Sequence, residues 1–189
     1  MDPLAKLFGS AARIKLLRLF LFNEENTFTI ADAAKRTKIS KDAARREIQS
    51  LAGATILKKK TGKGGAVFSA NVRFPHYEPL RTFLRTSSGV DDASISSNLK
   101  KAGTLRLVAL SGLFTGVPES KVDILIVGDR LDERTLATVV HSLEAELGRE
   151  LRYACFSTED FRYRVGVYDR LVRDVLDYPH RVVIDKIGI

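Results

Sequence analysis

The arrangement of apolar residues changes near residue 98, and this change constrains the fold more than any other feature of the chain. Before it, apolar residues recur mainly at helical spacing; after it, β-prone segments alternate with helical ones, as in α/β layers. The charge changes at nearly the same place, from 17 Lys/Arg and 7 Asp/Glu in residues 1–88 to 14 and 16 in residues 89–189. We therefore expect an α+β protein of two domains, 1–88 and 99–189, joined by a linker over 89–98.

Three helices are predicted in the first half. Apolar residues from Leu4 to Leu21 form one stripe, which predicts a helix over 3–22. Thr29 can cap a second, short helix, with Asp32 reaching back three residues. Ser40 is a suitable N-cap for a third helix over 41–52, which Gly53 ends.

The third helix has one apolar face and one polar face. Ala44, Ile48 and Leu51 have the spacing of residues that pack inward. The opposite face carries Lys41, Asp42, Arg45, Arg46 and Gln49. Arg can contact guanine and Gln adenine in the major groove of DNA, whereas Lys41, near the helix start, is better placed for a phosphate.

A β-hairpin is predicted after this helix. The segments 55–60 and 66–70 are β-prone, and the glycine-rich stretch 62–65 between them can form the turn. The hairpin carries Lys58, Lys59, Lys60 and Lys63. Three helices followed by such a hairpin form a winged helix-turn-helix, with these lysines directed to the DNA backbone or minor groove. A further helix is predicted over 76–86.

The run from Phe8 to Leu17, the segment Ile30–Ser40 and the segment Arg45–Leu51 are similar to ArsR-like winged-helix transcriptional regulators over most of residues 4–75. The resemblance implies sequence-specific binding to double-stranded DNA as a homodimer, with helix 41–52 as the recognition helix. The family's thiolate metal sites cannot be transferred, because this half contains no cysteine. The apolar stripe of helix 3–22 and helix 76–86 are the candidate dimer contacts.

The second half alternates strands and helices. Strands are predicted over 105–111, 122–127, 150–156 and 181–184, and helices over 131–147, from residue 158 and over 167–176. The second strand is almost entirely apolar, which indicates burial on both faces. Cys155, in the third strand, is expected to be a small buried residue.

The outline of residues 100–187, from Ser111-Gly112 through the strand that begins after Ser120, resembles polymerase-beta-like nucleotidyltransferases. In that family two carboxylates on the second strand hold metal ions. Here Lys121 stands where the first carboxylate belongs, and only Asp123 remains. The resemblance therefore implies a degenerate domain with a mixed sheet, no catalytic residues, no metal and no cofactor. Its vestigial ligand site would comprise Gly112, Lys121, Asp123 and, less securely aligned, Glu150.

These residues leave other interpretations open. Asp123 can cap backbone amides instead of contacting a ligand, and Lys121 can hold a phosphate or lie in solvent. No apolar run is long enough to span a membrane, and the N-terminus lacks a secretory signal, so we expect a cytoplasmic protein.

The sequence thus predicts a DNA-binding transcriptional regulator whose inactive second domain serves dimerisation, partner docking or the sensing of a small-molecule or nucleotide effector. A minimal nucleotidyltransferase regulated by its winged helix is the alternative. A module whose winged helix docks protein is a third possibility.

Overall fold

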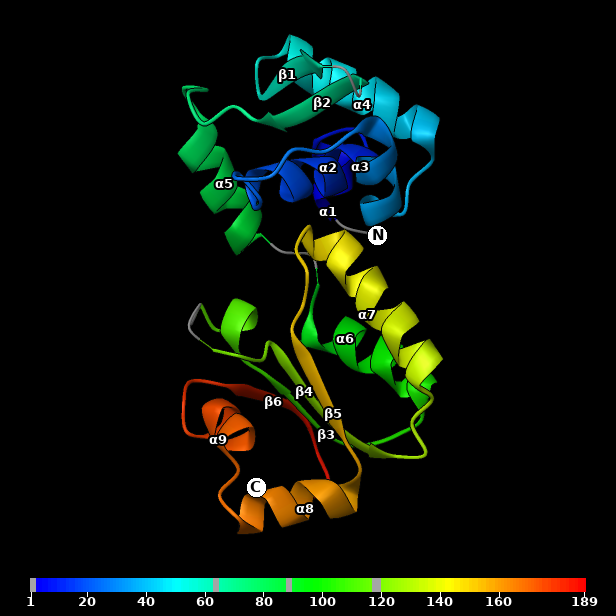
Figure 1. The fold of residues 1–189 in the computed structure, drawn as a ribbon, viewed down its shortest axis with the longest axis vertical. Helices are drawn as coiled ribbons and strands as arrows, with labels where there is room; N and C mark the ends of the chain where they lie inside the picture. Colours follow the sequence, from blue (N-terminus) through cyan, green and yellow to red (C-terminus); the bar gives the residue numbers. More distant parts are fainter. Residues whose placement is uncertain (1–2, 63–64, 88–89, 117–119) are drawn as a thin grey trace. The chain divides into compact units, whose positions relative to one another are not determined.

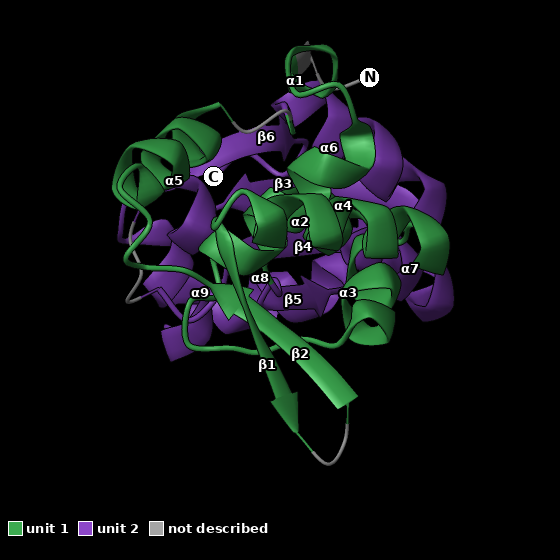
Figure 2. Ribbon diagram, turned by 90° about the horizontal axis from the view of Figure 1, so that it is seen from above, with its two compact units in different colours: residues 1–90, 142–149 green, residues 91–141, 150–189 purple. Residues whose placement is uncertain are grey.

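The computed structural model describes residues 3–62, 65–87, 90–116 and 120–189. Over these residues it is an α+β structure with nine α-helices, a two-stranded hairpin and a four-stranded mixed sheet (Figure 1). Two compact units share the chain, as Figure 2 shows in different colours. Unit 1 comprises residues 1–90 and 142–149, and unit 2 comprises residues 91–141 and 150–189.

Unit 1 consists of helices and one hairpin. Its elements are α1 (Pro3–Leu7), α2 (Ala11–Leu21), α3 (Ile30–Thr37), α4 (Lys41–Gly53), β1 (Leu57–Gly62), β2 (Gly65–Ala70) and α5 (Tyr77–Thr86). The predicted caps are confirmed: Thr29 and Asp32 form a capping box at α3, and Ser40 caps α4. The hairpin and the helix after it also form where the sequence predicts them.

The single helix predicted over 3–22 is wrong, because two helices occupy this segment. Gly9 adopts φ 75°, a left-handed conformation that stops α1. Ser10 then caps α2 by accepting a hydrogen bond from the Arg13 N–H at 3.2 Å. The apolar period runs through this break, so periodicity alone did not reveal it.

Helix α2 is the centre of the unit 1 core. From Ile14 to Leu21 every residue except Lys15 is buried, which leaves no face of this part of α2 open to a partner. Residues of the other helices and of the hairpin pack into the same core, among them Phe28, Ala44, Ile48, Phe68 and Leu84. The prediction that the stripe of α2 forms a dimer contact is therefore corrected: this stripe is used inside the monomer.

A buried arginine ties residues 142–149 to the rest of unit 1. The Arg18 side chain, in a residue only 2% exposed, donates to the carbonyl oxygens of Glu146 (3.1 Å) and Ser87 (3.2 Å). Asn23 donates to the carbonyl oxygen of Gly148 at 2.7 Å, and Lys15 forms an ion pair with Glu146. Each hydrogen bond from the Arg18 guanidinium thus goes to a carbonyl oxygen at or near the C-terminal end of a helix, where no N–H of the same helix is left to donate to it.

Unit 2 contains the mixed sheet. Its elements are α6 (Asp92–Leu99), β3 (Thr104–Leu110), β4 (Ile124–Asp129), β5 (Tyr153–Phe156), α8 (Thr158–Gly166), α9 (Arg170–Leu176) and β6 (Arg181–Asp185). Helix α7 (Glu133–Leu147) belongs to unit 2 up to His141 and to unit 1 from Ser142. The strand order is β5-β4-β3-β6, with β4 and β5 parallel and the other pairs antiparallel.

The core of unit 2 has a face covered by α8 and α9. Leu107, Leu125 and Val127 from the sheet pack there with Phe161 of α8 and Val172 of α9. The four apolar residues of β4 are buried completely, which confirms the prediction of a strand covered on both faces. Every strand predicted in this half is present within a few residues of its expected bounds.

Within the segment predicted as a linker, 89–98, residues 92–98 are helical, and residue 89 lies outside the described residues. Asp91 caps α6 by accepting from the Ser94 N–H at 2.6 Å, and Ile95 and Leu99 are fully buried. Two apolar residues four positions apart are enough to hold a short helix on a core. The serine-rich composition of this segment is typical of a linker, and for this reason the helix was not predicted.

None of the helices that the structure describes combines the length and the apolar character needed to cross a membrane.

Candidate nucleic-acid interface and a buried carboxylate site

Helix α4 presents its polar residues outward. Ala44 and Ile48 are fully buried and Leu51 nearly so, which fixes the rotation of the helix on the core. The turn before it contains Lys38 at φ 52°, and Ser40 accepts from the Ala43 N–H at 3.2 Å. The residues predicted for the outer face lie on the side away from the core, namely Lys41, Asp42, Arg45, Arg46 and Gln49.

The charges on this face are not equivalent. Arg45 donates to the Asp42 carboxylate at 3.2 Å, so this pair is locally neutral. Lys41 and Arg46 make no ion pair within the described residues. Glu47, the other acid of α4, is bound to Arg13 at 2.8 Å on the inner side. The outer face of α4 therefore carries a net positive charge.

The hairpin adds cations beside α4, because β1 packs against that helix (Figure 1). Lys58, Lys59 and Lys60 are exposed and make no ion pair within the described residues. Lys58 and Lys60 pair across the hairpin with Ser69 and Val67, so they share one face of the two-stranded sheet. Lys59 lies on the other face. Lys63, predicted for the same interface, lies outside the described residues.

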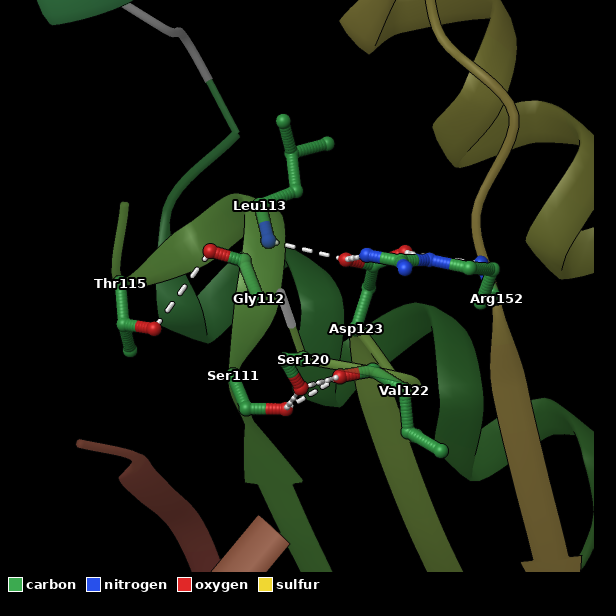
Figure 3. Close-up of polar contacts among 8 residues, drawn as sticks. All are labelled: Ser111, Gly112, Leu113, Thr115, Ser120, Val122, Asp123 and Arg152. Carbon is green, nitrogen blue, oxygen red and sulfur yellow. Dashed lines mark hydrogen bonds and ion pairs between the residues drawn. The ribbon is translucent and has the colours of Figure 1, made fainter. Parts of the chain in front are cut away.

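The Asp123 carboxylate in unit 2 is buried and fully engaged by hydrogen bonds (Figure 3). Its Oδ1 accepts from the Leu113 N–H and from Arg152 Nη2, each at 2.9 Å. Its Oδ2 accepts from the backbone N–H of Arg152 at 2.9 Å and from Arg152 Nε at 3.0 Å. The Arg152 guanidinium therefore binds both carboxylate oxygens in a bidentate ion pair. Of the alternatives left open by the sequence, the capping of backbone amides is the one that the geometry shows.

The environment of Asp123 changes its pKa. Burial acts to raise the pKa of the carboxyl, but the hydrogen bonds from Arg152 and the Leu113 N–H outweigh it and hold the pKa below its usual range. The carboxylate also raises the pKa of the Arg152 guanidinium through the same hydrogen bond. Asp123 is thus a charged group in a buried position at neutral pH.

Gly112 is required beside this carboxylate. A Cβ atom there would lie 2.3 Å from Asp123 Oδ1, and Gly112 has φ 50°. Below it, the hydroxyls of Ser111 and Ser120 both donate to the carbonyl oxygen of Val122 (Figure 3). The turn after β3 is therefore fastened to the residues that lead into β4.

The structure brings together only part of the predicted vestigial site. Gly112 and Asp123 are in contact, whereas Lys121 is directed to Asp174 at 3.6 Å and Glu150 is exposed before β5. The sequence pattern gave no sign of Arg152. The parallel register that places Ile124 beside Tyr153 also puts Asp123 next to Arg152, but strand pairing was needed to see it.

A metal ion does not fit at Asp123. A two-metal site needs several oxygen ligands, but the lone pairs of this carboxylate are taken by an arginine and an amide. Within the described residues, no group of three or more His, Cys, Asp or Glu side chains is placed to hold a metal ion.

A separate pocket of about 640 Å³ lies in unit 2, and none of the predicted ligand residues lines it. Cys155 is part of its wall and is exposed, so the prediction of a buried cysteine is wrong. The physical reason is the place of β5 at the edge of the sheet, where the strand pairs only with β4.

Comparisons of the chain with protein-family models, with curated proteins and with solved structures find no match. The function must therefore be argued from the geometry of the two units.

Proposed function

We propose that this chain is a transcriptional regulator that binds double-stranded DNA through α4 and the hairpin β1–β2. In this proposal unit 1 is a winged helix-turn-helix in which α4 is the recognition helix and the hairpin is the wing. The observation that carries the proposal is the set of exposed cations on two adjacent elements that no acidic side chain of the described residues neutralises: Lys41, Arg46, Lys58, Lys59 and Lys60.

The geometry supports different roles for α4 and for the hairpin β1–β2 in DNA binding. An α-helix fits the major groove of B-form DNA, where Arg46 and Gln49 can reach base edges. Arg45 is held by Asp42, which limits its guanidinium to fewer orientations for a bidentate contact. Lysines on a hairpin neutralise phosphates and fix the orientation of the protein without reading sequence.

Selection from a random pool of DNA duplexes tests this function directly. We expect the full chain to enrich a short motif, repeated with inverted symmetry at a spacing of about 34 Å between half-site centres if the protein is a dimer. Retention of all sequences alike would indicate only nonspecific binding. A failure to retain any duplex at low salt would refute the proposed function.

The salt dependence of DNA binding is expected to report the hairpin contacts. If each protomer neutralises about six phosphates, log Kobs should fall with log salt at a slope of about −5. The double variant K58A/K60A removes two cations from one face of the hairpin and should reduce that slope by about 2 per protomer. Fluorescence anisotropy at several salt concentrations measures it.

The variant K100A/K101A is the matched control, because it removes two exposed lysines from unit 2. Its slope should equal that of the unmodified protein. An equal decrease in both variants would show that general charge, and not the hairpin, determines the slope.

The proposal includes a homodimer, for which unit 1 offers an apolar patch. Leu7 is 71% exposed and Phe83 is 39% exposed, and the rings of Phe83 and Phe8 are 6.3 Å apart. Large exposed apolar side chains at adjoining positions are typical of an interface. We propose that this patch packs against a second copy of the chain. Each chain contributes one recognition helix, and a DNA site with two half-sites is bound by two such helices.

The double variant L7S/F83S is expected to be monomeric in sedimentation velocity and to bind a two-half-site duplex at least about tenfold more weakly, because simultaneous binding of both half-sites is lost. V165S/V167S, which changes two exposed apolar residues of unit 2, is the control and should remain dimeric. A dimer that persists in L7S/F83S would place the contact elsewhere.

For unit 2 we propose a nucleotidyltransferase-like outline that does not transfer nucleotides. At the position of the family's first metal-binding carboxylate, Lys121 supplies no lone pair for a metal ion. The remaining carboxylate, that of Asp123, is bound by Arg152. Incubation with labelled ATP and Mg²⁺ should leave the chain and added proteins unlabelled. Labelling that disappears in the D123A variant would instead establish the alternative, an enzyme.

A further inference from the structure

The unit 2 pocket lies at the edge of the sheet, between the edge strand β5 and the first turns of α7. In β5, Ala154 and Phe156 pack toward the core that includes α8 and α9, whereas Tyr153 and Cys155 alternate with them and face the other way. The volume of about 640 Å³ falls within the usual range of small-molecule sites, roughly 300–1,000 Å³.

Part of the pocket wall is apolar. Leu131 lies in the turn before α7, and Leu136 and Ala137 belong to the first turns of that helix. The 40% exposed Tyr153 adds aromatic surface, and Phe156, whose side chain packs toward the α8 and α9 core, also borders the pocket. Such a wall favours a ligand with an apolar group, because its burial releases water from both surfaces.

Two side chains of opposite charge also line the pocket. Arg130 and Glu133 form no hydrogen bond or ion pair through their side chains, with each other or with any other described residue. Arg130 has φ 55°, a conformation that is energetically costly for a bulky residue and that recurs at functional sites. The turn thus places the cationic side chain of Arg130 at the pocket, although glycine would adopt this positive φ at a lower energetic cost.

Glu133 lies near enough to Cys155 to influence it. Although the residue is exposed, neighbouring atoms shield the Cys155 thiol from part of the solvent, and this shielding, followed by the Glu133 carboxylate, raises the pKa of the thiol. The thiol is therefore uncharged at neutral pH, and among the described residues the side-chain charges that line the pocket are those of Arg130 and Glu133.

We propose that this pocket binds a small zwitterion with an apolar side chain, of the size of a free amino acid. Its carboxylate pairs with Arg130 and its ammonium group with Glu133. Its side chain packs on the apolar wall formed by Leu131, Leu136 and Tyr153. Arg130 and Glu133 are both exposed, so each charge pair contributes modestly, and a ligand with both charges forms two such pairs where a ligand with one charge forms only one. All lining residues belong to unit 2, so the test of this pocket does not depend on the proposed DNA interface.

The single cysteine of the chain gives a site-specific measurement. Cys155 is alkylated with iodoacetamide at pH 8.5, with and without L-leucine or L-phenylalanine, and the rate is followed by intact-protein mass spectrometry. At about ten times the Kd, a ligand in the pocket should slow alkylation about tenfold, because mainly the unliganded protein reacts. L-leucinamide, which lacks the carboxylate, and 4-methylpentanoate, which lacks the ammonium group, should protect much less.

Two variants assign the charges. R130N keeps a residue that tolerates positive φ and should abolish protection by leucine, measured against the alkylation rate of the same variant without ligand. E133Q should make leucine and 4-methylpentanoate protect to the same degree, with each rate compared with that of the same unliganded variant. Isothermal titration calorimetry gives the affinities independently. The proposal is overturned if neither amino acid slows alkylation, or if both one-charge analogues protect Cys155 as well as leucine does. It is also overturned if leucine still protects Cys155 in R130N.

Discussion

Replacing Arg45 and Arg46 together by alanine is expected to weaken binding to the selected duplex by about 100-fold. A factor of about 100 corresponds to about 2.7 kcal/mol, of which a bidentate pair of Arg46 with guanine supplies about 1–3 kcal/mol and the loss of the Arg45 cation from the DNA-facing side supplies the rest. Removal of Arg45 also leaves Asp42, which is highly exposed on the same face, without its cationic partner. An unneutralised carboxylate on a DNA-facing helix repels phosphates and weakens binding further.

The measurement is a titration of the selected duplex, and of a scrambled duplex, by fluorescence anisotropy. The R45A/R46A variant should lose most of its preference between the two duplexes. R162A/R170A is the matched control: it removes two exposed arginines that make no ion pair within the described residues, but from unit 2. Equal losses of affinity in the two variants would mean that α4 contributes charge only and is not the recognition helix.

Replacement of Asp123 by alanine is expected to destabilise unit 2 by about 2–3 kcal/mol. The substitution removes an acceptor of four hydrogen bonds, three of them from Arg152, and leaves the Leu113 N–H without its partner. Half of the Arg152 side chain is exposed and can be hydrated, so the cost is below the roughly 3–5 kcal/mol of breaking a fully buried ion pair. D123N, which retains an acceptor for one of these donors, should cost less.

Hydrogen exchange of β3 and β4 peptides measures this loss within unit 2. The control is D129A, which breaks the half-exposed pair of Asp129 with Arg106 and a long hydrogen bond (3.4 Å) from the Thr158 N–H, and should cost less than about 1 kcal/mol. Similar protection of β3 and β4 in D123A and D129A would show that the buried pair contributes no more than a surface pair.

The same pair predicts a dependence of stability on pH. Because the pKa of Asp123 is lower in the folded protein than the usual value of about 3.9, the unfolded chain binds the proton more readily. The stabilisation is therefore complete above about pH 5 and is lost as the pH falls from there through the folded pKa. D123A should show a flatter decrease of unit 2 stability in this acidic range than the unmodified protein.

Local elements could be predicted well because their signals are local. The spacing of Ala44, Ile48 and Leu51 identifies the inner face of α4, and the hydroxyls of Thr29 and Ser40 mark helix starts. The alternation of strands and helices in the second half likewise gave the elements of the mixed sheet. A periodic pattern cannot show a break that preserves its phase, which is why the interruption between α1 and α2 was missed.

Partners distant in the sequence could not be predicted. Arg152 reaches Asp123 only because β4 and β5 pair in parallel with one particular register. The exposure of Cys155 depends on β5 being an edge strand, and an apolar strand pattern does not reveal strand order. The burial of α2 on all sides depends on α3, α4, α5 and the hairpin packing around it, so its stripe looked available for a dimer.

The order of residues along the chain is enough to locate the helices and strands, the polar face of α4 and the concentration of positive charge, since each of these follows from residues within a few turns of one another. The neutralisation of Asp123 by Arg152, the enclosure of α2 and the pocket with Arg130 and Glu133 beside β5 emerge at the level of the folded units. They depend on packing and strand order, because side chains far apart in the chain become neighbours only when whole elements meet.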